Sequence, residues 1–324
     1  MLRSVFNNGR GISLVTTPQI ANLLARQTEF SSVGSDTPLS RISRRGVTQH
    51  TTSQSKSIRA TQPIQQGQLV MVNKAVLLVH PSYWNISWPQ REEITRLAIS
   101  RLPGGTQKAI LNLSSPPDQI NLYLSYIVWA HAGFPMVIRD QKHNVLFTGI
   151  SLINHSCAPN SHNRVESISF SGVVTAARDI QEGEEITISY WVDSDHSMHL
   201  RSFVERQQYI ERNGRFRCEC AYCEQGKAKD EILGSLLDQQ KSLQQKLESS
   251  SIAGSDLPAA FKLEKLYHSL GLEILMNVPY NIIAKTYSAM GREKLASVWL
   301  ERAANILALS GVETPQQQHG VDAS

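Results

Sequence analysis

Three short stretches of this 324-residue chain decide its fold: NHSCAPN at 154–160, GEEITISY at 183–190 and FRCECAYC at 216–223. The first and third hold all of its cysteines, which are Cys157, Cys218, Cys220 and Cys223. Zinc takes four soft ligands in a tetrahedron, and a CxCxxC loop supplies three thiolates from one bend. The fourth must come from elsewhere, and Cys157 is the one other cysteine. We therefore expect a zinc site, with free buried thiols as the alternative.

The charge balance argues against a nucleic-acid binder. Lys and Arg number 32 against 28 Asp and Glu, and charged residues make up 19% of the chain, below the roughly 25% of an average domain. The excess of four positive charges comes from residues 1–60, which hold 8 basic and 2 acidic residues. The rest is balanced, so we expect no direct nucleic-acid binding. The 41% hydrophobic content suits one sizeable domain with an appendage.

The longest uncharged stretch, residues 119–138, is long enough to span a bilayer. It contains Asn121, His131 and Pro135, which hydrocarbon tolerates poorly, so we expect a buried helix and no membrane contact. The N-terminal MLRSVFNNGR lacks the apolar run of a secretory signal. We expect a cytoplasmic or nuclear protein, with mitochondrial targeting as the lesser alternative because this start contains Arg and Ser but no acid.

The first half of the chain alternates between strand and helix signals. A turn at Gly9 leads into a strand to Thr17, and PQIANLLARQ after it has helical spacing behind a proline. Residues 31–57 are rich in Ser, Thr, Gln and Arg and predict a loop. Strand composition resumes at Ile58, and residues 89–134 are predicted to be mainly helical.

The second half changes from strands to helices at the cysteine cluster. Residues 145–190 predict short strands and turns, and helices follow to Ser310, with a linker at residues 249–254. Residues 280–303 match the small and large positions of one tetratricopeptide helix pair. Because one copy is visible, we expect a helix hairpin that serves for packing.

The order and separations of the three stretches resemble the SET-domain family of protein lysine methyltransferases. The closest layout is that of fungal SET proteins related to the SET and MYND group, without a MYND finger. The resemblance implies an α+β protein with the SET-domain β-clip fold, in which the first two stretches cross in a pseudoknot. It places a helical insertion at about 80–135 and a post-SET zinc module at about 214–226 within residues 1–227, followed by a C-terminal helical domain at 228–324.

The same resemblance implies the roles of individual residues. It makes Tyr190 catalytic, at the junction of a lysine channel and S-adenosylmethionine. It also implies cofactor contacts, which fall on Asn154, His155, Tyr190, Phe216, Lys56 and Ser57. Cys157 becomes the fourth zinc ligand. Glu184 and Glu185 follow a glycine and are expected to lie in a solvated turn without a catalytic role.

Three departures from the family concern turnover more than fold. Where the family has a GxG turn against the cofactor, this chain has Ser55-Lys56-Ser57, although Gly9-Arg10-Gly11 offers a second match. Gly214 stands where related proteins often have a channel tyrosine. Ala130-His131-Ala132 stands near the position of a cofactor-binding asparagine.

We therefore expect an S-adenosylmethionine-dependent protein lysine N-methyltransferase, with a catalytically inactive SET-like binding module as the alternative. Methyl transfer from a sulfonium mainly needs alignment. It also needs a neutral lysine, which an apolar channel favours by desolvation. The expected partner is a protein or peptide lysine, and the expected state is a monomer. The particular substrate and the extent of methylation are not encoded in any recognisable motif.

Two weaker patterns are expected to be solvated surface. His196 and His199 have a two-residue gap that metal ligands also use, but they lie in a polar stretch. Arg201, Arg206 and Arg212 share one face of a helix, which is usually exposed to water.

Overall fold

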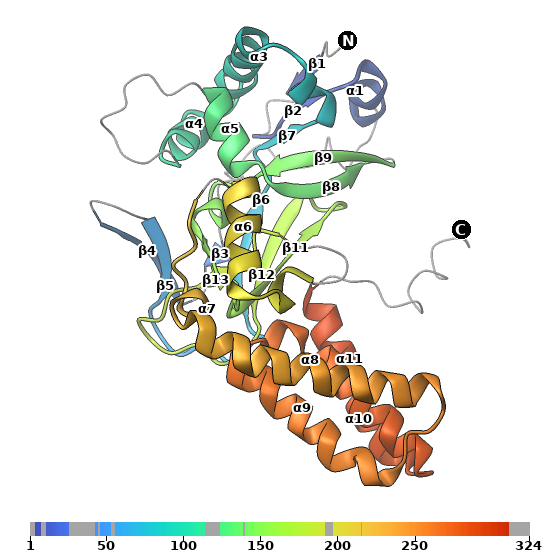
Figure 1. The fold of residues 1–324 in the computed structure, drawn as a ribbon. Helices are drawn as coiled ribbons and strands as arrows, with labels where there is room; N and C mark the ends of the chain where they lie inside the picture. The colour runs from blue at the N-terminus through green and yellow to red at the C-terminus, as the bar shows by residue number, and fades with distance from the viewer. Residues whose placement is uncertain are drawn as a thin grey trace.

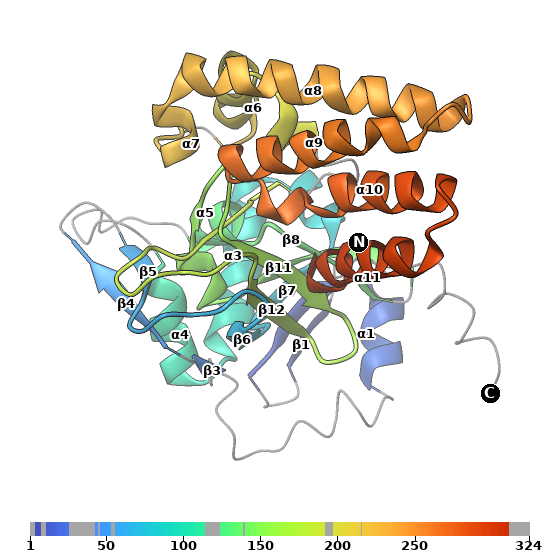
Figure 2. The ribbon, with the colours of Figure 1, turned by 90° about the horizontal axis from the view of Figure 1, so that it is seen from below.

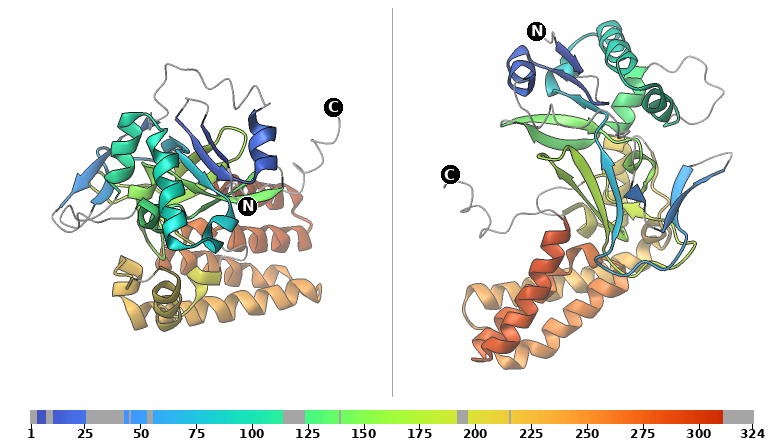
Figure 3. Two further views of the ribbon diagram at one scale, coloured as in Figure 1. Left: turned by 90° about the horizontal axis from the view of Figure 1, so that it is seen from above. Right: turned by 180° about the vertical axis from the view of Figure 1, so that it is seen from behind.

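The computed structural model describes residues 4–7, 11–25, 43–44, 46–52, 56–113, 124–138, 140–191, 197–214 and 216–310. The strands occupy the middle of the molecule, with one group of helices at each end (Figure 1). The view from behind shows the same order of helices, strands and helices (Figure 3, right). The architecture is α+β, as predicted.

Two sheets form the middle layer. One sheet has the order β1-β2-β7-β9-β8. Its strands are β1 (Ser4–Asn7), β2 (Ser13–Thr16), β7 (Leu77–Val79), β8 (Phe134–Ile138) and β9 (Gln141–Leu146). The other sheet has the order β11-β12-β6-β3. Its strands are β3 (Ser43–Arg44), β6 (Leu69–Lys74), β11 (Ser161–Glu166) and β12 (Ser171–Ala176).

Strand β12 shows how tightly this layer packs. Every residue of the strand is buried, although Thr175 and Ser171 are polar. A Cβ added to Gly172 would come within 2.3 Å of Ile150 Cδ1 and 3.2 Å of Phe147 Cζ. Glycine at this position therefore lets neighbouring side chains approach the strand backbone, which a larger residue would prevent.

Two short pairs of strands complete the layer and carry the sequence stretches of interest. Strand β10 (Asn154–His155) pairs in parallel with β13 (Thr187–Ile188). Strand β4 (Val47–Thr51) pairs antiparallel with β5 (Lys56–Ala60). Ala60 N–H donates to the Glu184 carbonyl and Ile186 N–H to the Ile58 carbonyl. Strand β5 thus lies beside the GEEITISY stretch.

The prediction of a loop for residues 31–57 is wrong at Ser43–Arg44, at Val47–Thr51 and at Lys56 and Ser57. The side chains of β4 are mostly exposed, so the polar composition is correct but does not exclude a strand. Backbone pairing with β5 supplies the hydrogen bonds that composition alone did not indicate. Much of the remaining predicted loop lies outside the described residues.

The helices at the N-terminal side match the predicted helical insertion. They are η1 (Pro81–Asn85), α3 (Trp88–Ser100), α4 (Gly104–Leu111) and α5 (Leu124–His131). The carboxylate of the nearly buried Glu92 accepts hydrogen bonds from the backbone of Leu124 and from the backbone and hydroxyl of Ser125, so α3 caps the start of α5. The buried helix expected within residues 119–138 is α5, followed by β8. Among the described residues, no helix has the length and apolarity to span a membrane.

Strand β2 and helix α1 (Pro18–Ala25) confirm the strand and helix predicted near the N-terminus. Between the strands, η2 (Ile150–Leu152) leads into β10. After the sheets come η3 (Ser197–Leu200), α6 (Phe203–Gly214) and α7 (Ala221–Glu224). Residues 216–223, which include the start of α7, are called the cysteine loop below.

The C-terminal helices lie side by side as one layer (Figure 2). They are α8 (Gly226–Glu248), η4 (Gly254–Asp256), α9 (Leu257–Leu270), η5 (Glu273–Leu275), α10 (Asn277–Ala289) and α11 (Glu293–Ser310). Gly291, with φ of +68°, turns the chain between α10 and α11. One hydrophobic core contains Cys157, Cys218 and Cys223 together with leucines of α8 and α9. The helical layer and the cysteine loop therefore stabilise one another.

Candidate active site

The sulfur atoms of Cys157, Cys218, Cys220 and Cys223 lie within 4.8 Å of one another. The Cys157 Sγ is 3.5 Å from that of Cys223 and 3.9 Å from that of Cys218. A tetrahedral zinc site with bonds of about 2.3 Å has sulfur to sulfur edges of about 3.8 Å. The four thiols are thus arranged as zinc requires, and residues 61 positions apart converge as the sequence predicted.

Zinc binds the thiolate form of cysteine, so a divalent cation at this cluster would displace the thiol protons on binding.

Two histidines, His155 and His199, contact Cys157, which lies two residues after the end of β10. The Nδ1–H of the His199 ring donates to the Cys157 carbonyl at 2.8 Å, and His199 is 1% exposed. The expectation of a solvated loop is wrong for His199 because this hydrogen bond offsets the loss of water around its ring; His196 lies outside the described residues. The Nε2 of His155 is 3.5 Å from the Cys157 Sγ.

A buried arginine supports the other side of the cluster. Arg206 is fully buried, and its guanidinium carbon lies 4.0 Å from the ring centroid of Tyr222. Tyr222 stands between Cys220 and Cys223 in the sequence. Arg206 also lies 3.8 Å from Asp230 and donates to the Arg201 carbonyl. The prediction of a solvated basic face is wrong for Arg206, because α8 and the cysteine loop cover this face of α6. Arg212 on the same helix is exposed.

Tyr190 is tied to the cysteine cluster through His155. The Tyr190 N–H donates to His155 Nδ1 at 3.2 Å, so the neutral ring carries its proton on Nε2, toward the Cys157 sulfur. Burial lowers the pKa of His155 to about 4, which keeps the ring neutral at pH 7. Tyr190 as a whole is 42% exposed, but its hydroxyl donates to the Ile153 carbonyl at 2.9 Å, and the burial of this hydroxyl raises its pKa to about 12.

A cleft of about 810 Å³ opens beside these residues; we call it the charged cleft. It is lined by Asn154, His155, Ser156, Ala158, Asn160, Arg178, Glu184, Glu185, Thr187, Tyr190, Phe216, Arg217, Cys218, Glu219, Cys220 and Ala221. Small-molecule sites commonly have volumes of about 300–1,000 Å³. The cleft combines polar groups with the aromatic rings of Tyr190 and Phe216 and so fits a cofactor that carries both charges and a base.

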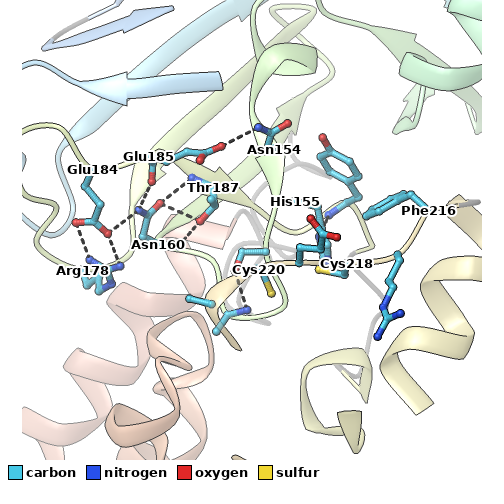
Figure 4. A pocket seen from close by; sticks show the side chains of 16 residues that line it. Asn154, His155, Asn160, Arg178, Glu184, Glu185, Thr187, Phe216, Cys218 and Cys220 are labelled. Atoms are coloured by element: carbon cyan, nitrogen blue, oxygen red, sulfur yellow. Dashed lines mark hydrogen bonds and ion pairs between the residues drawn. The ribbon is translucent and has the colours of Figure 1, made fainter. Parts of the chain in front are cut away.

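Hydrogen bonds between the first two sequence stretches build the polar side of the cleft (Figure 4). The Asn160 amide donates to the Glu185 carbonyl at 2.8 Å and accepts from the Thr187 N–H at 2.9 Å. The Asn154 amide donates to the Glu185 carboxylate at 2.7 Å. Although burial raises the pKa of Glu184, the Arg178 guanidinium at 2.5 Å holds it below its usual value. The two glutamates are therefore part of the cleft wall, and the expectation of a merely solvated turn is wrong.

The structure places Lys56 and Ser57 next to this cleft but not among its lining residues. The Lys56 carbonyl accepts from the Asn154 amide at 3.0 Å, and Ser57 is buried in β5. Gly11, by contrast, lies just before β2, which belongs to the sheet β1-β2-β7-β9-β8. The Ser55-Lys56-Ser57 match is therefore the one near the site; Ser55, Gly9 and Arg10 lie outside the described residues.

A second cavity of about 410 Å³ also has Tyr190 in its lining; we call it the aromatic cavity. Its lining residues are Tyr126, Ala130, His131, Gly133, Phe134, Ser151, Tyr190, Trp191, Asn213, Gly214 and Phe216. None of these described residues is an acid, a lysine or an arginine. Burial lowers the pKa of His131, so the cavity is uncharged at neutral pH.

Tyr190 and Phe216 line both cavities. Their ring centroids are 6.4 Å apart, with an angle of 71° between the planes. The sequence identified both residues but did not reveal Tyr126, Phe134 or Trp191. For Trp191, its position directly after Tyr190 and the loss of a side chain at Gly214 were the available signals.

Comparison with known proteins agrees with this geometry. A family model described as "SET domain" matches residues 56–191. Histone-lysine N-methyltransferase SET5 of Meyerozyma guilliermondii is 40% identical over 80 residues, which are 24% of this chain and 15% of that protein. Protein-lysine N-trimethyltransferase SMYD5 of Mus musculus is 39% identical over 80 residues, covering 24% and 18%. Histone-lysine N-methyltransferase SMYD3 of Homo sapiens is 40% identical over 93 residues, covering 28% and 19%.

The matched segment thus spans less than a fifth of the length of these relatives. A solved structure of a candidate histone methyltransferase from Plasmodium falciparum aligns over 47% of this chain and 97% of its own, with 14% identity and a TM-score of 0.27. At that score the structural likeness carries no argument, and the family assignment depends on the sequence matches.

Proposed function

Because residues 56–191 form a SET domain related to lysine methyltransferases, we propose that this chain is an S-adenosylmethionine-dependent protein lysine N-methyltransferase. The observation that carries the proposal is the shared wall formed by Tyr190 and Phe216 between two cavities. A donor in one cavity and an acceptor in the other would meet at this wall. In-line displacement requires that arrangement, because the nucleophile attacks opposite the leaving group.

The charged cleft would hold the cofactor, which supplies a methyl group already activated on a sulfonium. Asn154 and His155 form its inner wall, and Phe216 offers a ring face to the adenine. The carboxylates of Glu184 and Glu185 are engaged by Arg178 and Asn154, which keeps the cleft geometry in place without a ligand. Preorganised polar groups of this kind need little rearrangement on binding.

The aromatic cavity would receive the substrate lysine. Because its described lining residues carry no carboxylate, desolvation there lowers the pKa of a lysine and favours the neutral amine. The substrate lysine would first lose its ammonium proton to solvent, and the neutral amine held in this cavity would then be placed to accept the methyl group that the bound cofactor supplies, with the thioether of the cofactor as the leaving group. No residue needs to act as a strong base, since the proton can be lost before transfer.

Tyr190 would orient the amine and the methyl group. Its phenol stays protonated at neutral pH because its pKa is about 12, so it acts as a hydrogen-bonding group and not as a base. The proton is directed to the Ile153 carbonyl, which leaves the oxygen lone pairs free to accept contacts. Weak contacts from polarised CH groups to oxygen suit a methyl carried on a sulfonium.

Zinc in the four-cysteine site would hold this wall together. Phe216 precedes Cys218 by two residues, and Tyr190 is joined to Cys157 through His155. A metal bound to the cysteines would therefore fix both residues of the shared wall. Its role would be structural, since four thiolates leave no open coordination position.

Calorimetric titration with S-adenosylmethionine and with S-adenosylhomocysteine tests the proposal. We expect binding of both, followed by transfer of a labelled methyl group to lysines of a peptide array. Binding without transfer to any lysine peptide or protein would instead support an inactive SET-like binding module. That alternative is favoured by Ser55 and Ser57, which stand in the sequence where the GxG turn of the family has glycine. If millimolar S-adenosylmethionine gives no heat of binding while the zinc site is filled, the proposal that this chain is a methyltransferase is refuted.

A further inference from the structure

Gly214 is enclosed by two aromatic rings. A Cβ built on Gly214 would lie 2.8 Å from Phe216 Cε1 and 2.9 Å from both Cη2 and Cζ2 of Trp191. Real Cβ contacts are longer, so any other residue at position 214 requires the stacked rings of Trp191 and Phe216 to move. The space that a side chain at 214 would enter is filled by the six-membered ring of Trp191.

The Trp191 ring is held in this place from several sides. It stacks on Phe216 with a centroid distance of 6.0 Å and an angle of 22°. Edge contacts from His155 at 5.0 Å and Tyr209 at 5.8 Å fix the rest of the ring. Aromatic pairs at these distances stabilise one another beyond the area that they bury.

Trp191 faces one cavity and not the other. It lines the aromatic cavity together with Gly214 and Asn213, and it is absent from the lining of the charged cleft. With Tyr190 at 6.0 Å and Phe216 at 6.0 Å, it completes three aromatic walls at the boundary. Such walls favour an ammonium or methylammonium group and the alkyl chain that carries it.

We propose that Trp191 forms the wall of the lysine passage in place of a side chain at position 214. The ring enters the space from the strand side, directly after Tyr190, and contacts the alkyl stem and the amine of the substrate lysine. The loss of a side chain at 214 is thereby compensated within this chain. This inference rests on the proposed function, because it assigns a residue to the same passage.

A probe that enters the passage from the cofactor side removes the need to know the protein substrate. The probe is an S-adenosylhomocysteine analogue in which nitrogen replaces sulfur and carries a four-carbon aminoalkyl chain. The reference compound carries a methyl group on the same nitrogen. The ratio of their dissociation constants, measured by calorimetry on the zinc-loaded protein, reports the contribution of the passage alone.

In the wild-type protein we expect the aminoalkyl chain to tighten binding about tenfold. Trp191→Ala should bring the ratio to within about twofold of unity while the methyl compound binds as before. Trp191→Phe should keep most of the gain. Trp88→Ala, which removes a partly exposed tryptophan outside both cavities, should change neither constant.

A reciprocal pair of substitutions tests whether positions 191 and 214 share one space. Gly214→Tyr alone should lower the unfolding temperature because its side chain meets two rings. In the Trp191→Ala background the same Gly214→Tyr change should restore both stability and the gain from the aminoalkyl chain. If Trp191→Ala does not fold, Trp191→Leu provides the same background.

Equal ratios in wild type and Trp191→Ala would overturn the assignment of Trp191 to the passage. Failure of Gly214→Tyr to restore the ratio in that background would overturn the shared space. Failure of the proposed function gives different results: without a cofactor site the methyl compound would not bind the wild-type protein, and a site that binds cofactor without turnover would transfer no labelled methyl group to the peptide array, whatever the ratio of the dissociation constants.

Discussion

The charged cleft and the aromatic cavity share two side chains and differ in almost everything else. The cleft is lined by paired carboxylates, amides and a guanidinium, whereas the described lining of the cavity contains no permanent charge. The paired polar groups suit a charged cofactor that keeps part of its hydration. The uncharged cavity suits an amine that must lose its proton. Placing both at one wall lets a single tyrosine face two environments.

The difference follows from the elements that build each side. The cleft is formed by β10, β13 and the turn before β13, whose exposed backbone groups are satisfied by Asn154 and Asn160. The cavity is formed by residues of α5, β8 and α6 together with Trp191. Residues of the three sequence stretches make most of the charged cleft, whereas residues outside those stretches make most of the aromatic cavity.

Removal of zinc should break both sides at once and have the largest effect. The cysteine cluster anchors Phe216 and Tyr190, so chelation should lower the free energy of unfolding by about 5 kcal/mol or more and abolish cofactor binding. Metal analysis, thermal unfolding and cofactor titration check this before and after chelation. Zinc added back should restore binding and magnesium should not. Well under one zinc per purified chain, with unchanged stability, would contradict the metal site.

Tyr190→Phe should slow methyl transfer while leaving the charged cleft and the aromatic cavity intact. Loss of the hydroxyl should lower methyl transfer about 100-fold or more, while S-adenosylhomocysteine binds within about twofold of wild type because the ring remains. Single-turnover transfer and calorimetry measure the two quantities. Tyr209→Phe is the matched control, since Tyr209 contacts Trp191 but lines neither cavity. Transfer at the wild-type rate would remove Tyr190 from the mechanism.

Arg206→Ala should loosen the cysteine loop that both cavities share. Truncation removes the stack on Tyr222 and leaves Asp230 without its buried partner, so we expect a loss of about 3 kcal/mol in the free energy of unfolding. Arg212→Ala on the exposed face of the same helix should change it by no more than about 0.5 kcal/mol. Denaturant unfolding measures both. Equal effects would mean that the two arginines are in equivalent environments.

The smallest effect concerns a turn beneath the charged cleft. A Cβ on Gly271 would lie 3.6 Å from the Cβ of Ala158, which lines the cleft. Nearby, the Glu273 carboxylate lies 3.6 Å from the His268 ring as an ion pair and raises the pKa of His268 above its usual 6.5. The raised pKa stabilises the fold fully below pH 6.5, and this contribution is lost as pH rises through the folded value.

His268→Asn should therefore lower the unfolding temperature at pH 5.5 but not at pH 8.5. Because the His268 side chain is 49% exposed, we expect a difference below about 2 °C. Thermal unfolding at both pH values measures it. The same substitution in a Glu273→Gln background should show no pH dependence. A larger difference at pH 8.5 than at pH 5.5 would reverse the expected sign.

Chemistry-bearing motifs were predictable from the sequence because their residue types and spacings have few other uses. Three thiols in a CxCxxC arrangement plus one distant cysteine predicted a convergence that the structure confirms. Tyr190 and Phe216 were identified by the resemblance of the stretches that contain them. The mixed α+β architecture was implied by the same resemblance, and the helices before the first stretch followed from periodicity and turn residues.

Burial and pairing across the chain were decided by the tertiary structure. Arg206 and His199 read as solvated residues in the sequence, yet packing of α6, α8 and η3 around the cysteine loop buries both. The composition of residues 47–51 predicted a loop, but in the fold their backbone groups pair with β5 and form a strand. Trp191 gained its place because Gly214, 23 positions later, left room for a ring. Local sequence encodes which atoms a segment offers, whereas the distances between segments depend on how the whole chain packs.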